Sequence, residues 1–309
     1  MKKVMVKIFL VVVVLLSGCV NTSKTDAKIE SIAFGANHIV AVFNDGEIMV
    51  WGDNSKEQSN VPVKTKNIIA AAAGLNHTLV LKGDGTVIAW GDNSKGQCDV
   101  PADLKNVVAV AAGYDHSVAL RSDGTVIAWG DNEYGQSTIP TGLPIVYAVC
   151  AGKGHTSVVT EKGEVISWGY YAEDILQPPY DIIPIKDIKS AYSHIIALQT
   201  DNSVIGWGRP GFSEDILTEE LTNITSISTG IGLSIVLKAD GTVGVLGGNH
   251  YELATYSKQL SDISYVAAGF FVGGAVKKDG TLIIWGEEVN RFNNPDIENL
   301  ILYEGSNSY

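Results

Sequence analysis

Five of the six histidines recur at a fixed interval of 39 residues, a pattern that raises the question of a chemical role. They are His38, His77, His116, His155 and His194. Neutral imidazole binds transition metals and exchanges protons near neutral pH, so a ring of such side chains is a candidate metal site or proton relay. The alternative is that each histidine satisfies backbone groups in a repeated unit. Two further units hold Leu233 and Val272 at this position, which leaves a metal ring incomplete, so we interpret the histidines as structural.

Three Asp-Asn pairs also recur with the same interval, at Asp53, Asp92 and Asp131. They lack the alternating oxygen ligands and the closing glutamate of a calcium loop, and we expect them to cap turns. The sequence contains no glycine-rich phosphate loop opening a helix and no GxSxG elbow. We therefore predict that the protein is not an enzyme and has neither a metal site nor a cofactor.

The elements that position these residues are the copies of one repeat. The segment VIAWGDN occurs at residues 87–93 and again at 126–132. The Trp-Gly pair that it contains recurs in step with the histidines, and Leu246-Gly247 takes its place in a sixth copy. The tryptophans of this structural repeat are Trp51, Trp90, Trp129, Trp168, Trp207 and Trp285. Seven units without a net insertion thus run from about residue 29 to about residue 301.

Each unit reads as β-strands. In the third unit, strands are predicted at residues 107–112, 117–120 and 125–129, and a tight Asp123-Gly124 turn joins the last two. A short fourth strand is predicted near Ser137–Ile139, before Pro140.

Four antiparallel strands cannot bury both faces of a sheet, but seven such sheets packed around an axis can. We predict an all-β fold, a seven-bladed β-propeller of 39-residue four-stranded repeats spanning residues 29–305, with a tail at 306–309. An open solenoid is the alternative, although its end copies should be degenerate caps and the first copy is a good one. NLILYEG, residues 299–305, resembles an eighth copy of the first strand of the unit, offset by three residues, and we expect it to fasten the ring near the first unit.

The N-terminal segment has the features of an export signal. Three lysines precede an apolar run, residues 8–16, that is too short to span a bilayer, and Leu16-Ser17-Gly18-Cys19 resembles a bacterial lipobox. We predict a signal peptide at residues 1–18, a lipidated Cys19 and a tether over residues 19–28. An ordinary secretory signal is the alternative. The predicted location is the extracytoplasmic face of the cell membrane, with the lipid as the only membrane contact.

Charge and cysteine content narrow the class of partner. Removing residues 1–18 takes away three lysines and no acid, which leaves 19 basic and 34 acidic residues and a formal net charge of −15. This balance argues against nucleic-acid binding, because phosphate contacts need Lys and Arg. Cys98 and Cys150 lie at different phases of the repeat, so neither a disulfide framework nor a metal spacing is indicated.

The segment AAGYDHSVALRSDGTVIAWGDNEYGQ, residues 111–136, resembles the repeat of the regulator of chromosome condensation family. The short, gapless repeat is similar to that of the secreted bacterial propellers that inhibit class A β-lactamases. The resemblance implies a seven-bladed propeller that works as a docking surface. It leaves the partner open, because unrelated functions share such folds.

Topology predicts where aromatic side chains gather. Loops between the first and second strands and loops after the third strand emerge on one face, and they carry ten of the nineteen Phe and Tyr residues. The predicted partner-binding face consists of Tyr114, Tyr134, Tyr170, Tyr171, Tyr192, Phe212, Tyr251, Phe270, Phe271 and Phe292. The opposite face is expected to hold mainly Asp-Gly turns.

Aromatic residues interleaved with acids are typical of a protein-binding surface. We therefore predict a monomeric, membrane-anchored scaffold or inhibitor that binds another protein, with a β-lactamase or a penicillin-binding protein as the partner that the resemblance implies. Two alternatives stay open at this point: a guanine-nucleotide-exchange regulator like the eukaryotic family members, and a module that binds cell-wall glycans.

Overall fold

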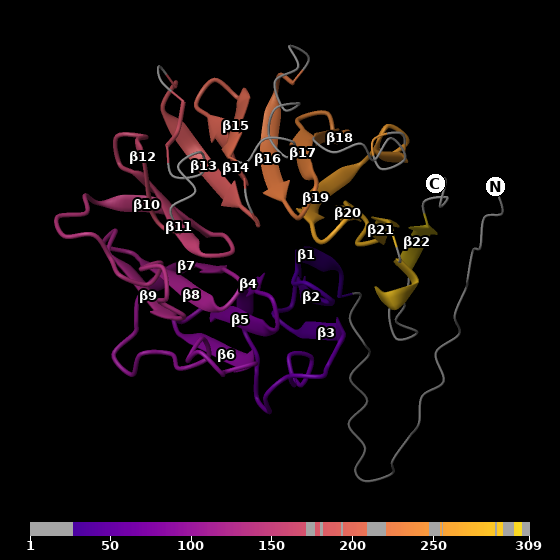
Figure 1. The fold of residues 1–309 in the computed structure, drawn as a ribbon. Helices are drawn as coiled ribbons and strands as arrows, with labels where there is room; N and C mark the ends of the chain where they lie inside the picture. The colour runs from indigo at the N-terminus through magenta and orange to yellow at the C-terminus, as the bar shows by residue number, and fades with distance from the viewer. Residues whose placement is uncertain are drawn as a thin grey trace, which may run out of the picture.

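The computed structural model describes residues 27–170, 177–179, 182–192, 194–208, 221–246, 254, 256–287, 289–292 and 300–304. Within this part of the chain there are seven β-sheets, one for each 39-residue unit, arranged around a common axis (Figure 1). The prediction of an all-β protein built from sequence repeats is therefore confirmed.

Each sheet orders its strands as they follow in the chain, from an inner strand at the axis to an outer strand at the rim. The inner strands are β1 (Ile29–Phe34), β4 (Ile68–Ala73), β7 (Val107–Ala112), β10 (Val146–Ala151), β13 (Ile185–Ser190), β16 (Ile224–Thr229) and β19 (Ile263–Ala268). The middle strands are β2 (His38–Phe43), β5 (His77–Lys82), β8 (His116–Arg121), β11 (His155–Thr160), β14 (His194–Gln199), β17 (Ser234–Lys238) and β20 (Val272–Lys277). The outer strands are β3 (Ile48–Gly52), β6 (Val87–Gly91), β9 (Val126–Gly130), β12 (Val165–Gly169), β15 (Val204–Gly208), β18 (Val243–Leu246) and β21 (Leu282–Gly286).

The ring has two faces, which we call the turn face and the loop face. The turn face holds the Asp-Gly turns between middle and outer strands and the start of each inner strand; for example, Val107 N donates to Gly85 O of the preceding unit at 3.0 Å. The loop face holds the loops between inner and middle strands and the loops after the outer strands. These two kinds of loop are joined by backbone hydrogen bonds such as Asp131 N to Asp115 O at 2.8 Å.

The predicted Asp-Gly hairpins form because the turn satisfies its own polar groups. Asp84 accepts the Thr86 backbone N–H at 3.0 Å and the Thr86 hydroxyl at 2.6 Å, and Gly85 has a φ of +78° that a Cβ would strain. The hydrogen bonds from Thr86 stabilise the carboxylate and lower the pKa of Asp84 to about 2.

The predicted fourth strand is absent from the third unit, where Ser137–Ile139 lies in a turn and irregular backbone. The physical reason is that the loop uses its own donors and acceptors. Ser137 N donates to Asn132 Oδ1 at 3.0 Å, and Thr138 N donates to Gly135 O at 3.0 Å, so these groups are not available for a ladder. Six sheets therefore contain three described strands each.

The hydrophobic core lies between neighbouring sheets. Leu79 and Leu81 of the second sheet are fully buried and belong to one cluster with Val107, Ala119 and Trp129 of the third. Alternating side chains of one strand thus fill the space against the next sheet, and each buried leucine contributes about 2 kcal/mol. Equivalent clusters occupy the other junctions, so each unit is stabilised mainly by its neighbours.

In each of the first three units, the loop after the outer strand forms hydrogen bonds to the next sheet. The carbonyl of Gln97, in the loop after β6, accepts Trp129 Nε1 at 2.9 Å and the Ser117 hydroxyl at 2.8 Å, both from the third sheet. Gln58 and Gln136 make the same contacts to the second and fourth sheets. The recurring glutamine and tryptophan are therefore the two halves of one contact between adjacent sheets.

The ring closes by the same contact. Trp51 of the first sheet donates its Nε1 to the carbonyl of Phe292 at 2.9 Å, and Phe292 occupies the repeat position of Gln58 in the seventh unit. Phe292 ends a short 3-10 helix, η2 (Val289–Phe292). Side chains of the first sheet, such as Ile32, share one core cluster with Val272 and Ile284 of the seventh, so the first and last sheets are packed together.

The predicted C-terminal strand forms as β22 (Leu300–Glu304), but it does not add an inner strand. It pairs in parallel with β21 at the outer edge of the seventh sheet, with Leu302 opposite Ile284. Leu300 and Leu302 pack against the cluster that joins the seventh and first sheets, so the strand does support the junction. No helix in the described residues is both long enough and apolar enough to cross a membrane.

Candidate partner-binding face

The five repeated histidines lie buried between sheets, each at the start of a middle strand. The Nε2 atom of His38 lies 3.0 Å from the hydroxyl of Thr78 in the next sheet, and that hydroxyl donates its proton to Gln58 O at 3.1 Å. Nε2 must therefore be the donor in the first bond. The other Nε2 atoms also contact hydroxyl groups: His77 to Ser117 at 3.2 Å, His116 to Thr156 at 3.0 Å, His155 to Ser190 at 2.6 Å, and His194 to Ser234 at 2.9 Å and to Thr229 at 2.5 Å.

Burial keeps these imidazoles neutral. Desolvation lowers the pKa from 6.5 to about 4 for His38, His155 and His194, and to about 3 for His77 and His116. In four of the five units a glycine three residues before the histidine makes room for the ring, and Ala191 takes this position before His194. A Cβ on Gly113, for example, would lie 2.2 Å from His116 Cε1. No cluster of three or more His, Cys, Asp or Glu side chains suited to a metal occurs in the described residues.

The Asp-Asn pairs lie in the loops after the outer strands, where their oxygens bind groups of their own loop. Asp131 Oδ2 accepts Gln136 Nε2 at 2.8 Å, and Asn132 Oδ1 accepts Ser137 N at 3.0 Å. These oxygens therefore hold the loop shape that presents the Gln136 carbonyl to the fourth sheet.

Neither described cysteine is engaged in a disulfide. Burial raises the pKa of Cys98 to about 12, with further contributions from Asp92 and Asp99, and burial likewise raises the pKa of Cys150 to about 12. Cys98 Sγ lies 3.3 Å from Asp92 O, in the place of the serine hydroxyl that makes this contact in the third unit. Both thiols are thus poor nucleophiles.

Seven side chains at one phase of the repeat surround the axis where the inner strands end at the loop face. They are Ala36, Leu75, Tyr114, Lys153, Tyr192, Ile231 and Phe270. All but Lys153 line a cavity of about 80 Å³ on the axis, together with the small residues that precede them. The sequence-based prediction included the three aromatic residues of this set but missed Leu75 and Ile231, which the shared interval of 39 residues was sufficient to find.

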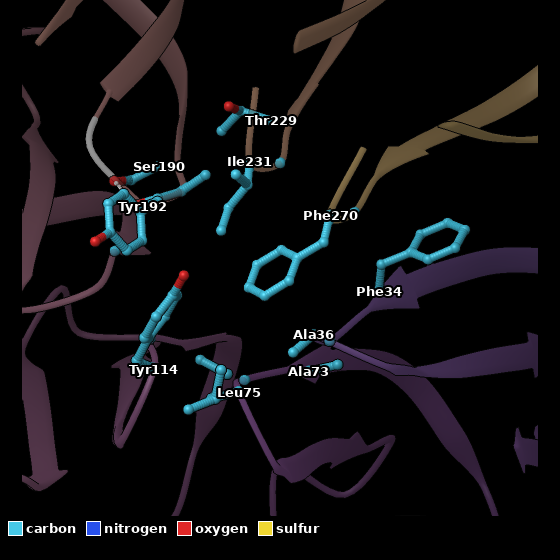
Figure 2. Close-up of a pocket in the computed structure, with 18 of the residues that line it drawn as sticks. Phe34, Ala36, Ala73, Leu75, Tyr114, Ser190, Tyr192, Thr229, Ile231 and Phe270 are labelled. Carbon is cyan, nitrogen blue, oxygen red and sulfur yellow. Dashed lines mark hydrogen bonds between the residues drawn. The ribbon is translucent and has the colours of Figure 1, made fainter. Parts of the chain in front are cut away.

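Three predicted aromatic residues meet at the mouth of this cavity, as Figure 2 shows. The ring of Tyr114 lies 5.5 Å from that of Tyr192 and 6.0 Å from that of Phe270, in tilted arrangements. Burial raises the pKa of Tyr114, and the neighbouring Tyr192 and Asp115 add to the effect. These rings are partly buried, so they form an apolar mouth that still reaches solvent.

The aromatic surface continues outward from the mouth. Lys153 Nζ lies 3.1 Å from the Tyr192 hydroxyl and 4.6 Å from the centre of its ring. Beside Lys153, Tyr134 and Tyr170 approach each other edge to face with centroids 4.9 Å apart, next to Gly154. They expose 42% and 48% of their surface, which makes them the most accessible of the predicted aromatic residues that the structure describes.

Two other predicted aromatic residues differ from this pattern. Phe292 was predicted to lie on the binding face, and that is wrong: it is fully buried and packs edge to face on Phe34, with ring centroids 5.9 Å apart. It is buried because, at the junction of the seventh and first sheets, it takes the repeat position at which Gln58, Gln97 and Gln136 contact the next sheet. Phe271 is partly buried at a φ of +54°, and its ring covers the neighbouring Gly232.

The remaining predicted residues of the face, Tyr171, Phe212 and Tyr251, lie outside the described residues, as does the predicted lipidation site Cys19. All six tryptophans of the repeat lie buried, with at most 9% of their surface exposed.

Acidic groups accompany the aromatic surface. Asp115 follows Tyr114 in the loop and is half-buried; burial raises its pKa, and Asp131 and Asp92 raise it further. Lys95 lowers the pKa of Asp115 and forms an ion pair with Asp131 at 3.4 Å. Three carboxylates share one lysine here, so this side of the mouth favours a positively charged partner group.

Comparison with known proteins agrees with this architecture. The model of the regulator of chromosome condensation (RCC1) repeat matches residues 29–58, 68–97 and 107–136, so these three segments are RCC1 repeats. A search of curated protein sequences finds no significant match.

Several solved structures share the fold at low sequence identity. The ectodomain of the receptor kinase CR4 from Physcomitrella patens has a TM-score of 0.70 at 16% identity, covering 84% of this chain and 74% of that one. Human WBSCR16 has a TM-score of 0.65 at 18% identity, covering 80% and 86%. Prp20p from Saccharomyces cerevisiae, in a study of its binding to Gsp1p and histones, has a TM-score of 0.62 at 18% identity, covering 78% and 80%.

Proposed function

We propose that this RCC1-repeat chain is a non-catalytic scaffold that binds another protein through its loop face. In this proposal the seven sheets are the blades of a closed seven-bladed propeller, and a lipid on Cys19 holds the protein on the extracytoplasmic side of the cell membrane. The observation that carries the proposal is the aromatic surface of the loop face, which runs from Phe270, Tyr114 and Tyr192 at the axis to Tyr134 and Tyr170 farther out.

The shape and charge of this surface indicate which side chains a partner would present to it. The cavity at the mouth, about 80 Å³, has room for one small apolar side chain, and the surrounding rings offer flat apolar contacts. The carboxylates near Asp115 favour a lysine or arginine beside that anchor. Aromatic anchors with a charged rim are typical of protein interfaces. By resemblance to the propellers that inhibit class A β-lactamases, the partner we propose is a β-lactamase or a penicillin-binding protein.

The RCC1 repeats favour a second candidate, a regulator like the eukaryotic family members. The yeast protein Prp20p binds Gsp1p and histones, and this chain shares its fold. Acceleration of nucleotide release from a purified small GTPase would support this candidate over the first. Finding the chain acylated at Cys19 outside the cytoplasm would contradict it.

A photo-crosslinking experiment tests which face binds. Benzoylphenylalanine replaces Tyr134 on the loop face or, as the matched control, Tyr147 on the turn face; the two tyrosines are 42% and 41% exposed. After irradiation of intact cells, we expect a protein adduct from the first position and none from the second. Adducts from Tyr147 alone would contradict the assignment of the loop face.

The role of the mouth is tested by measuring the affinity between the purified protein and its purified crosslinked partner. The double variant Tyr192→Ala, Phe270→Ala removes two of the three rings at the axis, and we expect its affinity for the crosslinked partner to fall at least about tenfold, since central aromatic residues dominate interface energies. Tyr147→Ala should bind like the wild type. A double variant that folds and binds normally would show that the mouth is not part of the interface.

A further inference from the structure

The turn face carries an apolar surface that the sequence analysis did not predict. The second residue of each inner strand is skipped in the pairing with the middle strand; in the second unit, for example, the register shifts between Ile68 and Ala70. Such a bulge leaves its extra residue unpaired. The skipped residues are all exposed and are Glu30, Ile69, Val108, Tyr147, Lys186, Thr225 and Ser264.

Three consecutive units place large apolar residues at this position. Ile69, Val108 and Tyr147 are 60%, 53% and 41% exposed, and they come from the neighbouring strands β4, β7 and β10. Ile145, 55% exposed, extends the surface over the turn at Gly124. We call these four residues the apolar arc. Single exposed apolar residues are ordinary, but a contiguous group on one sector of a ring is typical of a contact surface.

Lysines flank the arc on the same face. Lys66 and Lys105 are exposed and precede Ile69 and Val108 by three residues each. Basic side chains beside exposed apolar ones are the combination that binds the headgroup region of an anionic bilayer. The same face also holds the carboxylates of Asp84 and Asp123 in its turns, and Glu47 pairs with Lys66 at 3.4 Å, so the apolar side chains rather than the net charge carry the contact.

The chain also enters the ring at the turn face. Lys28 N donates to Asn44 Oδ1 at 3.1 Å, and Asn44 N donates to Lys28 O at 3.0 Å, which fixes the entry point beside the first hairpin turn. The inner strand that follows lies against β4 of the second unit, where the arc begins. Seven residues separate Cys19 from Ala27, and the eight steps along the chain between them can span at most about 28 Å. A lipid on Cys19 therefore keeps this face near the bilayer.

We propose that the apolar arc rests in the interfacial region of the lipid bilayer, with the turn face toward the membrane and the loop face directed away from it. The inference depends on the membrane-anchoring part of the proposed function and adds an orientation to it. Ile69, Val108, Tyr147 and Ile145 contact the boundary between headgroups and acyl chains, and Lys66 and Lys105 lie at the level of the headgroups. The aromatic mouth then stays accessible to a partner.

Depth-dependent quenching tests this orientation on the full acylated protein in vesicles of phosphatidylethanolamine and phosphatidylglycerol. A thiol-reactive, polarity-sensitive fluorophore is attached to Val108→Cys on the arc or to Tyr134→Cys on the loop face. Labelling is selective because the pKa of Cys98 and that of Cys150 are raised to about 12. We expect blue-shifted emission that nitroxide-labelled lipids quench at position 108, and neither effect at position 134.

Variants separate the possible failures. Adding Ile69→Ser and Tyr147→Ser to the labelled Val108→Cys chain should reduce the quenching while the protein still floats with the vesicles. A chain that floats without quenching at position 108 overturns the orientation and leaves the anchor intact. A chain that does not float overturns both the anchor and the orientation. A blue shift that grows with protein concentration without vesicles would show that a second copy covers the arc, which also overturns the proposal.

Discussion

The hydrogen bond between the repeat tryptophan and the preceding loop can be measured with a matched pair of substitutions. Trp129 donates its Nε1 to Gln97 O at 2.9 Å, whereas the Nε1 of Trp285 is buried without a partner among the described residues. Trp→Phe removes the same atoms at both sites and abolishes a hydrogen bond at only one. The comparison therefore isolates the contact that joins one sheet to the next.

The structure sets the expected size of the difference. At Trp129 the lost bond costs about 1 kcal/mol, since Gln97 O keeps its bond from Ser117 at 2.8 Å and is not left unpaired. At Trp285 the substitution removes an unpaired buried N–H, which offsets about 1 kcal/mol or more of the lost packing. We expect Trp129→Phe to lower the free energy of unfolding by about 2 kcal/mol more than Trp285→Phe does.

Urea unfolding followed by circular dichroism provides the two free energies, with the denaturant dependence checked for equality between variants. Trp90→Phe is a second test, because Trp90 is 8% exposed like Trp129 and donates to Gln58 O at 3.0 Å. It should match Trp129→Phe. If Trp285→Phe proved as destabilising as the other two, the indole hydrogen bond would not contribute to the junction, and the reasoning would be refuted.

Three further predictions concern the repeat itself. Burial lowers the pKa of His116 in the folded chain from 6.5 to about 3, so protonation favours the unfolded chain. The stability of the fold should therefore be complete above about pH 6.5 and should fall progressively as the pH drops toward 3. Urea midpoints measured at pH 7 and at pH 5 should show this loss. Cys98→Ser should change the free energy of unfolding by less than about 0.5 kcal/mol, because Ser137, at the same position of the next unit, makes the equivalent bond to Asp131 O at 2.8 Å. A larger loss of stability in urea titrations would contradict this equivalence. Gly113→Ala should be strongly destabilising, because the new Cβ would lie 2.6 Å from Gly152 O. The control Gly135→Ala has open space around its new Cβ and strains only its own φ of +81°. Similar melting temperatures for the two variants would contradict the packing role of Gly113.

Much of the fold was predictable because it depends on local chemistry repeated at a constant interval. The Asp-Gly turns, the strands on either side of them and the buried tryptophans follow from residue type and spacing, as Thr86 and Asp84 illustrate. The fourth strand was not predictable in this way. Ser137–Ile139 has strand-like composition, but Asn132 and Gly135 capture its backbone donors, and that competition depends on the folded loop.

The candidate site, too, was predictable only where it depends on the repeat interval. Tyr114, Tyr192 and Phe270 share one phase, so repetition around an axis brings them together once the ring closes. Tyr134 and Tyr170 are 36 residues apart and therefore stand at different phases, and only the packing beside Gly154 places their rings in contact. The burial of Phe292 was within reach of the sequence, because stepping the 39-residue interval from Gln58 arrives at it.

The sequence by itself determined the repeated unit, its hairpins and the phase at which each side chain stands, because these depend on interactions within about forty residues. Only the tertiary structure decided how the seventh sheet meets the first, which aromatic rings stay exposed, and that the bulged residues of three units form the apolar arc. These features depend on residues far apart in the chain, such as Trp51 and Phe292, whose contact exists only when all the units have packed into a ring.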